Sequence, residues 1–217
     1  GMRPDAAVLV ATVRALKTHA GRYNVIPGKP LPPAMLEDNL DDVLAGAANL
    51  RKHIEIVREF GVSPVVALNV FPTDHPGEID AVRKVAEAAG AHFASSTHVV
   101  DGGDGAIDLA HAVVAACDHK ADFRYTYDLE DSLVEKLTKV ATKVYGADGI
   151  DIAPAAAKEL AHFEDLGYGT FPVVIAKTHL SLSHDPSLKG APTGWRLPVR
   201  EVRAAVGAGY ILSLIHI

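Results

Sequence analysis

The feature that most constrains the fold is the alternation of short apolar runs with amphipathic stretches. Continuous apolar runs at 6–13 and 64–70 are typical of strands buried on both faces. Apolar side chains recur at three- and four-residue spacing over 36–60 and 78–89, which predicts helices. This order predicts a parallel sheet with helical crossovers, in which the run at 6–13 is a central strand.

The remaining residues continue this pattern. Residues 22–33 contain four prolines and form a predicted loop. A strand near 91–96 leads through a glycine loop to a helix that ends near Cys117. The later predicted elements are helices over 128–145 and 154–166, a strand over 171–178, a polar loop over 181–198 and a last strand within 199–212. The predicted fold class is α/β with a mostly parallel sheet.

Net charge, the length of the apolar runs and the cysteine count exclude several classes of function. The 21 basic and 27 acidic side chains give a formal charge of −6, so no global positive field attracts nucleic acid or an anionic membrane. The apolar runs are far shorter than the roughly 20 residues that span a bilayer. A single cysteine, Cys117, allows neither an internal disulfide nor a cysteine-rich metal site. We therefore expect a cytoplasmic protein without nucleic-acid or membrane partners.

Residues 69–78, with the sequence NVFPTDHPGE, form the first candidate cluster. They follow a predicted parallel strand at its carboxyl end, where open α/β sheets bind ligands. The cluster brings together an amide, Asn69, an aromatic ring, Phe71, and the polar side chains of Thr73, Asp74 and His75. An equally supported alternative is that a polar residue only caps the following helix while Phe71 fills the core.

Residues 98–108, HVVDGGDGAID, form the second candidate cluster, at another junction of strand and helix. Glycines such as Gly102 and Gly103 allow the backbone to approach a ligand, and amides at a helix start attract anions. The segment matches neither the dinucleotide fingerprint nor the P-loop. From the residues alone, a tight turn with a helix cap is the favoured interpretation.

The third candidate cluster is the basic segment 176–204, which lacks regular periodicity. Long loops of this kind are often functional. Its side chains, Lys177 and Arg196 among them, suit a phosphate or carboxylate group. A surface loop or a subunit contact is the alternative.

Common catalytic motifs are absent from the sequence. It contains no G-x-x-x-x-G-K-[ST], no H-E-x-x-H and no G-x-S-x-G. These residues therefore offer no P-loop for nucleotide phosphates, no zinc-protease helix and no serine nucleophile elbow. No metal site is predicted.

Four blocks of the sequence, at 4–21, 49–74, 101–110 and 176–209, resemble successive blocks of the formate–tetrahydrofolate ligase family, also called formyltetrahydrofolate synthetase. The resemblance implies a one-carbon reaction that serves purine supply. ATP phosphorylates formate to formyl phosphate, and N10 of tetrahydrofolate then attacks the formyl carbon to give 10-formyltetrahydrofolate. It also implies ATP with Mg, a monovalent cation, and a homotetramer for the full-length protein.

The resemblance also implies a folate site. In the family, the phenylalanine of the FPTD block and a tryptophan of an H-W-x-x-G-G block flank the folate. Phe71 matches the first, whereas Val99 stands at the tryptophan position, so we expect weakened or altered folate binding. The expected folate-side residues are Asn69, Phe71, Thr73, Asp74, His98, Val99, Gly102 and Gly103. Lys177 and Arg196 are the expected anion-binding residues, and no catalytic residue is assigned.

The family carries its P-loop upstream of the PDAAVLVAT block, which predicts that the chain is an internal fragment that is inactive alone. The implied divisions are the end of a nucleotide domain (1–48), a folate-side α/β domain (49–187) and the start of a third domain (188–217). We expect exposed apolar surface along 6–13 and little contribution to the fold from ILSLIHI at 211–217, which resembles foreign sequence. The alternative function is a non-catalytic folate-binding or subunit-contact module.

Overall fold

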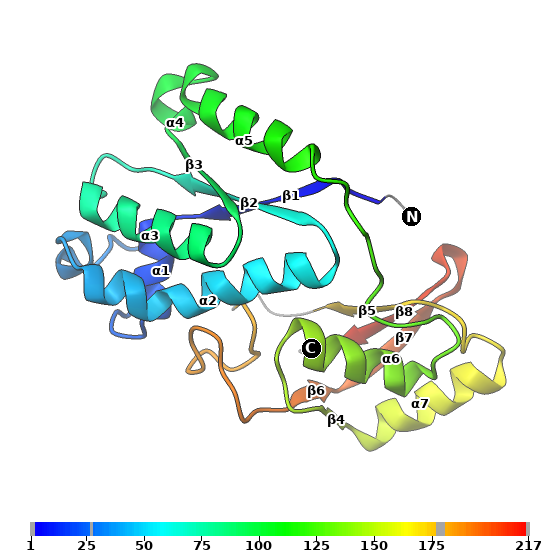
Figure 1. Ribbon diagram of the computed structural model, residues 1–217. Helices are drawn as coiled ribbons and strands as arrows, with labels where there is room; N and C mark the ends of the chain where they lie inside the picture. The colour runs from blue at the N-terminus through cyan, green and yellow to red at the C-terminus, as the bar shows by residue number, and fades with distance from the viewer. Residues whose placement is uncertain (1–2, 27, 177–180, 216–217) are drawn as a thin grey trace. The chain divides into compact units, whose positions relative to one another are not determined.

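A computed structural model of the chain describes residues 3–26, 28–176 and 181–215 (Figure 1). The chain forms two compact units, Gly1–Arg124 and Tyr125–Ile217. The sequence instead predicts divisions at residues 48 and 187, and strand pairing crosses both of these positions. The assignment of residues 1–48, 49–187 and 188–217 to three domains of a longer protein stays a prediction.

The first unit is built on a parallel sheet of three strands in the order β1-β2-β3. The strands are β1 (Ala6–Ala11), β2 (Ser63–Asn69) and β3 (His92–Ser96). Because all three run in the same direction, their carboxyl ends meet at one edge of the sheet. The structure therefore confirms a parallel sheet with helical crossovers and the α/β fold class.

Helices cover both faces of this sheet (Figure 1). On one face lie α1 (Val13–His19), the 3-10 turn η1 (Pro33–Leu36), α2 (Leu40–Glu59) and α3 (Pro76–Ala88). On the other face lie α4 (His98–Asp101), η2 (Asp104–Ala106) and α5 (Ile107–Cys117), of which α5 packs against β3 and β2.

Two local features fix the position of α2. Its amino end is capped by Asn39, whose side-chain oxygen accepts a hydrogen bond from the Asp42 N–H at 3.1 Å. Its glycine at position 46 permits close contact with α1, because a Cβ there would lie 1.7 Å from the Leu16 carbonyl oxygen. Only glycine fits this crossing without a backbone shift.

The core of the first unit lies between the sheet and helices α1, α2 and α3. It includes the fully buried Val43, Ile54 and Val82 together with Val66 and Leu68 of β2. This arrangement follows from the helical spacing of the apolar residues and from the continuous apolar run of β2.

The central position predicted for the run at 6–13 is not seen in this chain. Within the described residues β1 pairs only with β2 and therefore lies at an edge of the sheet. Val8 and Val10 are 44% and 73% exposed. The expected exposed apolar surface along this run is confirmed.

The second unit contains two small sheets. In the first, β4 (Ile150–Ile152) and β6 (Leu197–Val199) pair in parallel. The second has the order β5-β8-β7, in which β5 (Val173–Ala176) is parallel and β7 (Glu201–Ala205) antiparallel to β8 (Tyr210–Leu214). The helical elements are α6 (Leu133–Lys139), the π-helical η3 (Val140–Val144), α7 (Pro154–Asp165) and the 3-10 turn η4 (Val206–Ala208).

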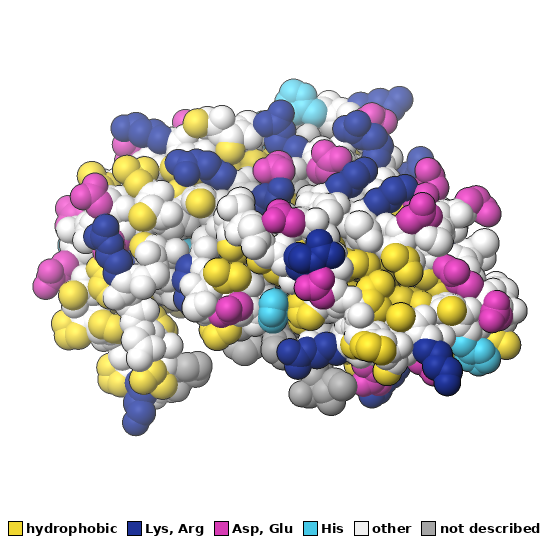
Figure 2. Space-filling view, turned by 90° about the horizontal axis from the view of Figure 1, so that it is seen from below, with side chains coloured by type: hydrophobic (Ala, Val, Ile, Leu, Met, Phe, Trp, Pro, Cys, Tyr) yellow, Lys and Arg dark blue, Asp and Glu magenta, His cyan; other side chains and the backbone are white. Residues whose placement is uncertain are grey.

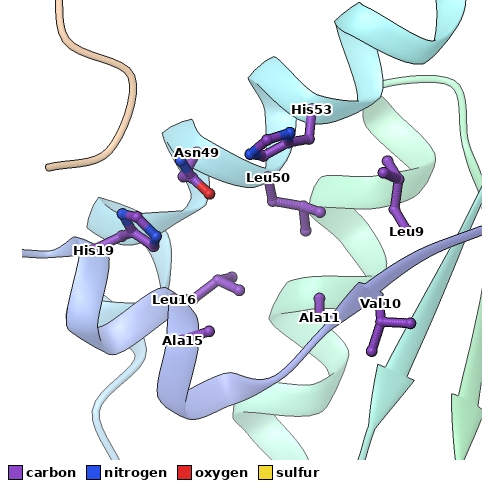
Figure 3. Close-up of a pocket in the computed structure, with 9 residues that line it drawn as sticks. All are labelled: Leu9, Val10, Ala11, Ala15, Leu16, His19, Asn49, Leu50 and His53. Atoms are coloured by element: carbon purple, nitrogen blue, oxygen red, sulfur yellow. The ribbon is translucent and has the colours of Figure 1, made fainter. Parts of the chain in front are cut away.

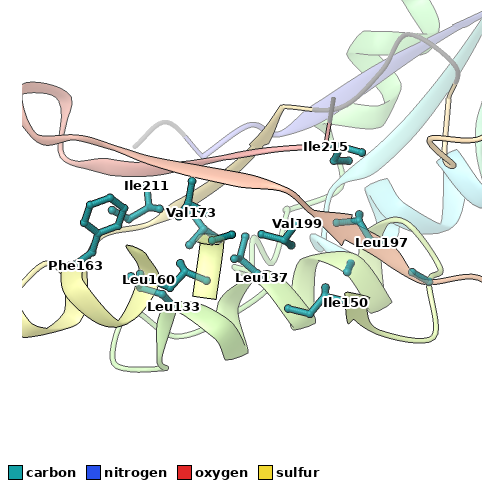
Figure 4. Close-up of a cluster of buried hydrophobic side chains, with 14 of the residues drawn as sticks. Leu133, Leu137, Ile150, Leu160, Phe163, Val173, Leu197, Val199, Ile211 and Ile215 are labelled. Atoms are coloured by element: carbon teal, nitrogen blue, oxygen red, sulfur yellow. The ribbon is translucent and has the colours of Figure 1, made fainter. Parts of the chain in front are cut away.

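The end of the chain corrects two predictions. The single strand predicted within 199–212 is a hairpin of β7 and β8, joined by η4 and by Gly209 at φ +71°. The prediction that residues 211–217 contribute little to the fold is wrong for 211–215. Ile211 and Ile215 are 0% and 1% exposed, and both lie in the hydrophobic cluster of this unit (Figure 4).

Within the part of the chain that the structure describes, we find no helix with both the length and the apolar character needed to cross a membrane.

Candidate functional site

Chemistry-bearing side chains gather at the carboxyl ends of β1 and β2. Asn69 is the last residue of β2, and Phe71, Thr73 and Asp74 follow it in the connection to α3. Arg14 lies in the first turn of α1, directly after β1. We refer to these five residues as the strand-end cluster.

A tight turn orders the phenylalanine of this cluster. Asp74 N–H donates to the Phe71 carbonyl oxygen at 2.9 Å, and Phe71 N–H donates to Asp74 Oδ2, also at 2.9 Å. Burial raises the pKa of the Asp74 carboxyl, while the hydrogen bond from Phe71 N–H and the charge of Arg14 act in the opposite direction. Asp74 therefore stabilises the backbone turn that carries the Phe71 side chain.

Arg14 is a cluster member that the sequence analysis missed. Its Cζ lies 3.8 Å from the centroid of the Phe71 ring, and its Nη2 donates to Thr73 Oγ1 at 2.9 Å. The signal was available, because 6–13 and 64–70 were both predicted as strands of one parallel sheet. Residues that follow two such strands come together at one edge.

A buried ion pair joins the helices that follow the two strand ends, α1 and α3. Lys17 Nζ lies 2.5 Å from Glu78 Oε1, and both side chains are 1% exposed. Lys17 also donates to the carbonyl oxygens of Glu37 at 2.6 Å and Met35 at 3.1 Å. Glu78 accepts from the Asn39 N–H at 2.9 Å. The pair thus ties α1, α3 and the segment before α2 together.

The second predicted cluster lies at the carboxyl end of β3. His98 and Val99 belong to α4, and both are exposed, Val99 by 67%. His98 Nδ1 lies 2.9 Å from the hydroxyl oxygen of Ser96, the last residue of β3. Because Asn69 pairs with Ser96 in the sheet, the first and second predicted clusters follow neighbouring strands.

The glycines of this second cluster have local structural tasks. Gly102 has φ +60°, and its N–H donates to the His98 carbonyl oxygen at 3.0 Å. Gly103 accepts a hydrogen bond from the Ala106 N–H at 3.0 Å. These contacts fit the alternative of a tight turn, and ligand binding by Gly102 and Gly103 stays a prediction.

The third predicted cluster is only partly described. Lys177 lies outside the described residues. Arg196 precedes β6 in the second unit, where its Nε lies 2.6 Å from Asp151 Oδ1 and its Nη2 donates to the Ile150 carbonyl oxygen at 2.6 Å. Its guanidinium therefore already contacts a carboxylate, and anion binding by Arg196 stays a prediction.

The first unit also contains a pocket of about 280 Å³ beside β1 (Figure 3). Its polar lining comes from α1 and α2, namely His19, Asn49 and His53, and the rest of its lining is apolar. None of the predicted site residues lines it, and it has no charged lining residue. We therefore base the candidate site on the strand-end cluster.

Surface charge is mixed. On the face that Figure 2 shows, Lys and Arg side chains lie among Asp and Glu side chains. Among the described residues, no group of three or more His, Cys, Asp or Glu side chains is placed to hold a metal ion. The candidate site therefore rests on stacking and hydrogen bonding by the strand-end cluster.

Comparison with known proteins places the chain in a family. Residues 1–216 match the family model described as formate–tetrahydrofolate ligase. A formate–tetrahydrofolate ligase of Cutibacterium acnes is 96% identical over 214 residues, which are 99% of this chain and 38% of that protein. One from Saccharopolyspora erythraea is 62% identical over the same shares. The chain thus spans about 38% of the length of these relatives, and it belongs to the formate–tetrahydrofolate ligase family.

Proposed function

We propose that the chain supplies the folate-side part of an ATP-dependent ligase that joins formate to tetrahydrofolate. The observation that carries this proposal is the strand-end cluster, in which an ordered aromatic ring lies at the edge where open α/β sheets bind ligands. Phe71 offers a surface on which a flat heterocycle stacks. Membership of the ligase family supports tetrahydrofolate as that heterocycle.

The other residues of the cluster have polar roles in this proposal. Asn69 Oδ1 is buried and accepts no hydrogen bond from the described residues. A buried acceptor without a partner is costly. In this proposal the Asn69 side chain rotates when folate binds, and its Oδ1 then accepts an N–H of the ligand. His98 and Val99 contact the folate from the neighbouring strand end, next to Gly102 and Gly103. Lys177 and Arg196 hold anionic groups of the substrates.

The overall reaction consumes formate, ATP and tetrahydrofolate and releases 10-formyltetrahydrofolate, ADP and phosphate. When bound, Mg–ATP supplies the phosphoryl group that activates formate. In our proposal the Mg–ATP site lies largely outside this segment, and the longer protein also binds a monovalent cation. The contribution of this chain is to hold the folate with N10 directed at the activated formyl carbon. We further propose a cytoplasmic homotetramer for the longer protein, without nucleic-acid or membrane partners.

Turnover measurements test this function. We define the chimeric ligase as the Cutibacterium acnes relative with its matching segment replaced by this chain. We expect it to form 10-formyltetrahydrofolate and ADP only when formate, ATP and tetrahydrofolate are all present. The 217-residue chain alone is expected to form no ADP. Absence of turnover by the chimeric ligase argues against the proposed function, and ADP formation by the isolated chain argues against its inactivity.

Replacement of Val99 by Trp is expected to strengthen tetrahydrofolate binding. The side chain at this position is exposed, so a larger ring fits without disturbing the core. An added aromatic contact is worth about 0.5–1.5 kcal/mol, which corresponds to roughly 2- to 10-fold in Kd. Calorimetric titration of the chimeric ligase measures this change. The matched control is Val114→Trp on α5, where Val114 is 63% exposed and lies outside both clusters. Equal affinity in wild type and Val99→Trp contradicts a folate-contacting role for position 99.

A further inference from the structure

The guanidinium of Arg14 covers one face of the Phe71 ring. Its Cζ is 3.8 Å from the ring centroid, which is within the range of direct contact between carbon atoms and of a cation–π interaction. Arg14 comes from α1 and Phe71 from the connection after β2, so the contact joins two neighbouring strand ends. A ligand that stacks on Phe71 while Arg14 keeps this position must therefore use the opposite face of the ring.

The position of the guanidinium is fixed by its neighbours. Nη2 of Arg14 donates to Thr73 Oγ1 at 2.9 Å, two residues beyond the ring that it covers. Its Nε is buried and has no hydrogen-bond partner among the described residues. A buried N–H without a partner costs free energy. The observed orientation thus combines the Nη2 hydrogen bond to Thr73 and the contact with the Phe71 ring with an Nε that has no partner among the described residues.

This contact has two consequences for ligand binding. It holds the Phe71 ring in one orientation, which lowers the entropic cost of ordering the ring when a ligand binds. It also draws ring electron density towards the cation, which makes the opposite face less negative and a better partner for an electron-rich ring. The amino-substituted rings of tetrahydrofolate are electron-rich.

We propose that Arg14 is a positioning residue that prepares Phe71 to stack with the folate. This inference rests on the proposed function, because it takes tetrahydrofolate as the ligand of the strand-end cluster. Arg14 acts through Phe71 and is not assigned a contact with the reacting atoms.

Steady-state kinetics of the chimeric ligase test this role. Arg14→Met keeps a stem of similar shape but removes the charge and the planar group. We expect it to raise KM for tetrahydrofolate by about 2- to 30-fold. KM for ATP, KM for formate and kcat are expected to stay within about twofold, because these quantities do not depend on stacking with the folate. Arg14→Lys keeps the charge without the plane and is expected to lie between wild type and Arg14→Met.

Two further variants separate positioning from a general structural effect. Arg83→Met removes a similar contact in the same unit, where the Arg83 guanidinium lies 4.7 Å from the centroid of Phe93. It is expected to leave KM for tetrahydrofolate unchanged. In a Phe71→Leu background, Arg14→Met is expected to add little to the increase that Phe71→Leu causes alone, because the two residues act as one unit.

The outcomes are distinguishable. If the wild-type chimeric ligase does not bind tetrahydrofolate, the proposed function fails and this inference falls with it. If wild type binds it and Arg14→Met leaves its KM unchanged, only the positioning role is overturned. Equal increases in all three KM values, or full additivity with Phe71→Leu, also overturn it.

Discussion

Replacement of Lys17 by Met is expected to lower the free energy of unfolding of the first unit by about 3–5 kcal/mol. Lys17 and Glu78 are both 1% exposed, and their charged atoms lie 2.5 Å apart. The variant leaves the carboxylate of Glu78 buried without its counter-charge. It also removes the hydrogen bonds from Lys17 Nζ to the carbonyl oxygens of Met35 and Glu37. These two bonds fix the segment before α2.

Native-state hydrogen exchange of the β2 amides in increasing urea measures this loss, because β2 is the central strand of the sheet. The matched control is Lys52→Met. Lys52 pairs with Glu55, whose side chain is 65% exposed, so the control is expected to change the free energy by less than about 1 kcal/mol. Similar losses in the two variants would mean that the buried pair does not hold α1 and α3 together.

Replacement of Ile211 by Ala is expected to destabilise the second unit by about 2–5 kcal/mol. Ile211 is fully buried in β8, the strand to which both β5 and β7 pair. Removing its side chain beyond Cβ leaves a cavity between the sheet and the helices of the unit (Figure 4). Trp195 is the single tryptophan and is buried in the same cluster, so its fluorescence in urea reports this unit.

The surface variant Val206→Ala serves as the control for Ile211→Ala. Val206 is 51% exposed, and its truncation is expected to change stability by less than about 0.5 kcal/mol. An Ile211→Ala variant as stable as this control would support the sequence-based view that 211–217 contribute little to the fold.

Much of the first unit was predictable, because its elements carry strong local patterns. The strand at 64–70 and the helix over 36–60 follow from continuous apolar residues and from helical spacing, and Gly61 at φ +69° ends the helix region as expected. The position of a strand within the sheet was harder to predict than the strand itself. The apolar run at 6–13 is compatible with a central or an edge strand, because its pattern does not reveal what lies on its second side.

The second unit was less predictable because its strands are short and its pairing is non-local. β4 and β6 have three residues each and are separated by more than 40 positions, so neither gives a periodic signal of its own. The helix predicted over 128–145 begins only at Leu133, because Ser132 and Glu135 form a capping box there. Propensity alone did not locate that cap.

The candidate site also contains residues that the sequence predicted and one that it did not. The residues of the 69–78 segment were identified because they follow a recognisable strand and lie close together in sequence. Arg14 was missed because its hydrogen-bond partner Thr73 is 59 positions away. Joining them required combining the two predicted strands at 6–13 and 64–70, whereas each candidate cluster was identified from one continuous segment.

The most direct test of the central claim is the affinity of the chimeric ligase for tetrahydrofolate, measured by calorimetry with and without the Phe71 ring. We expect Phe71→Ala to raise Kd by about 5- to 150-fold, since loss of a stacked ring costs on the order of 1–3 kcal/mol. Phe123→Ala is the control, because Phe123 stacks on Phe60 with ring centroids 6.2 Å apart, away from the strand-end cluster. An unchanged Kd in Phe71→Ala, or an equal loss in both variants, would contradict a folate site at the carboxyl ends of β1 and β2.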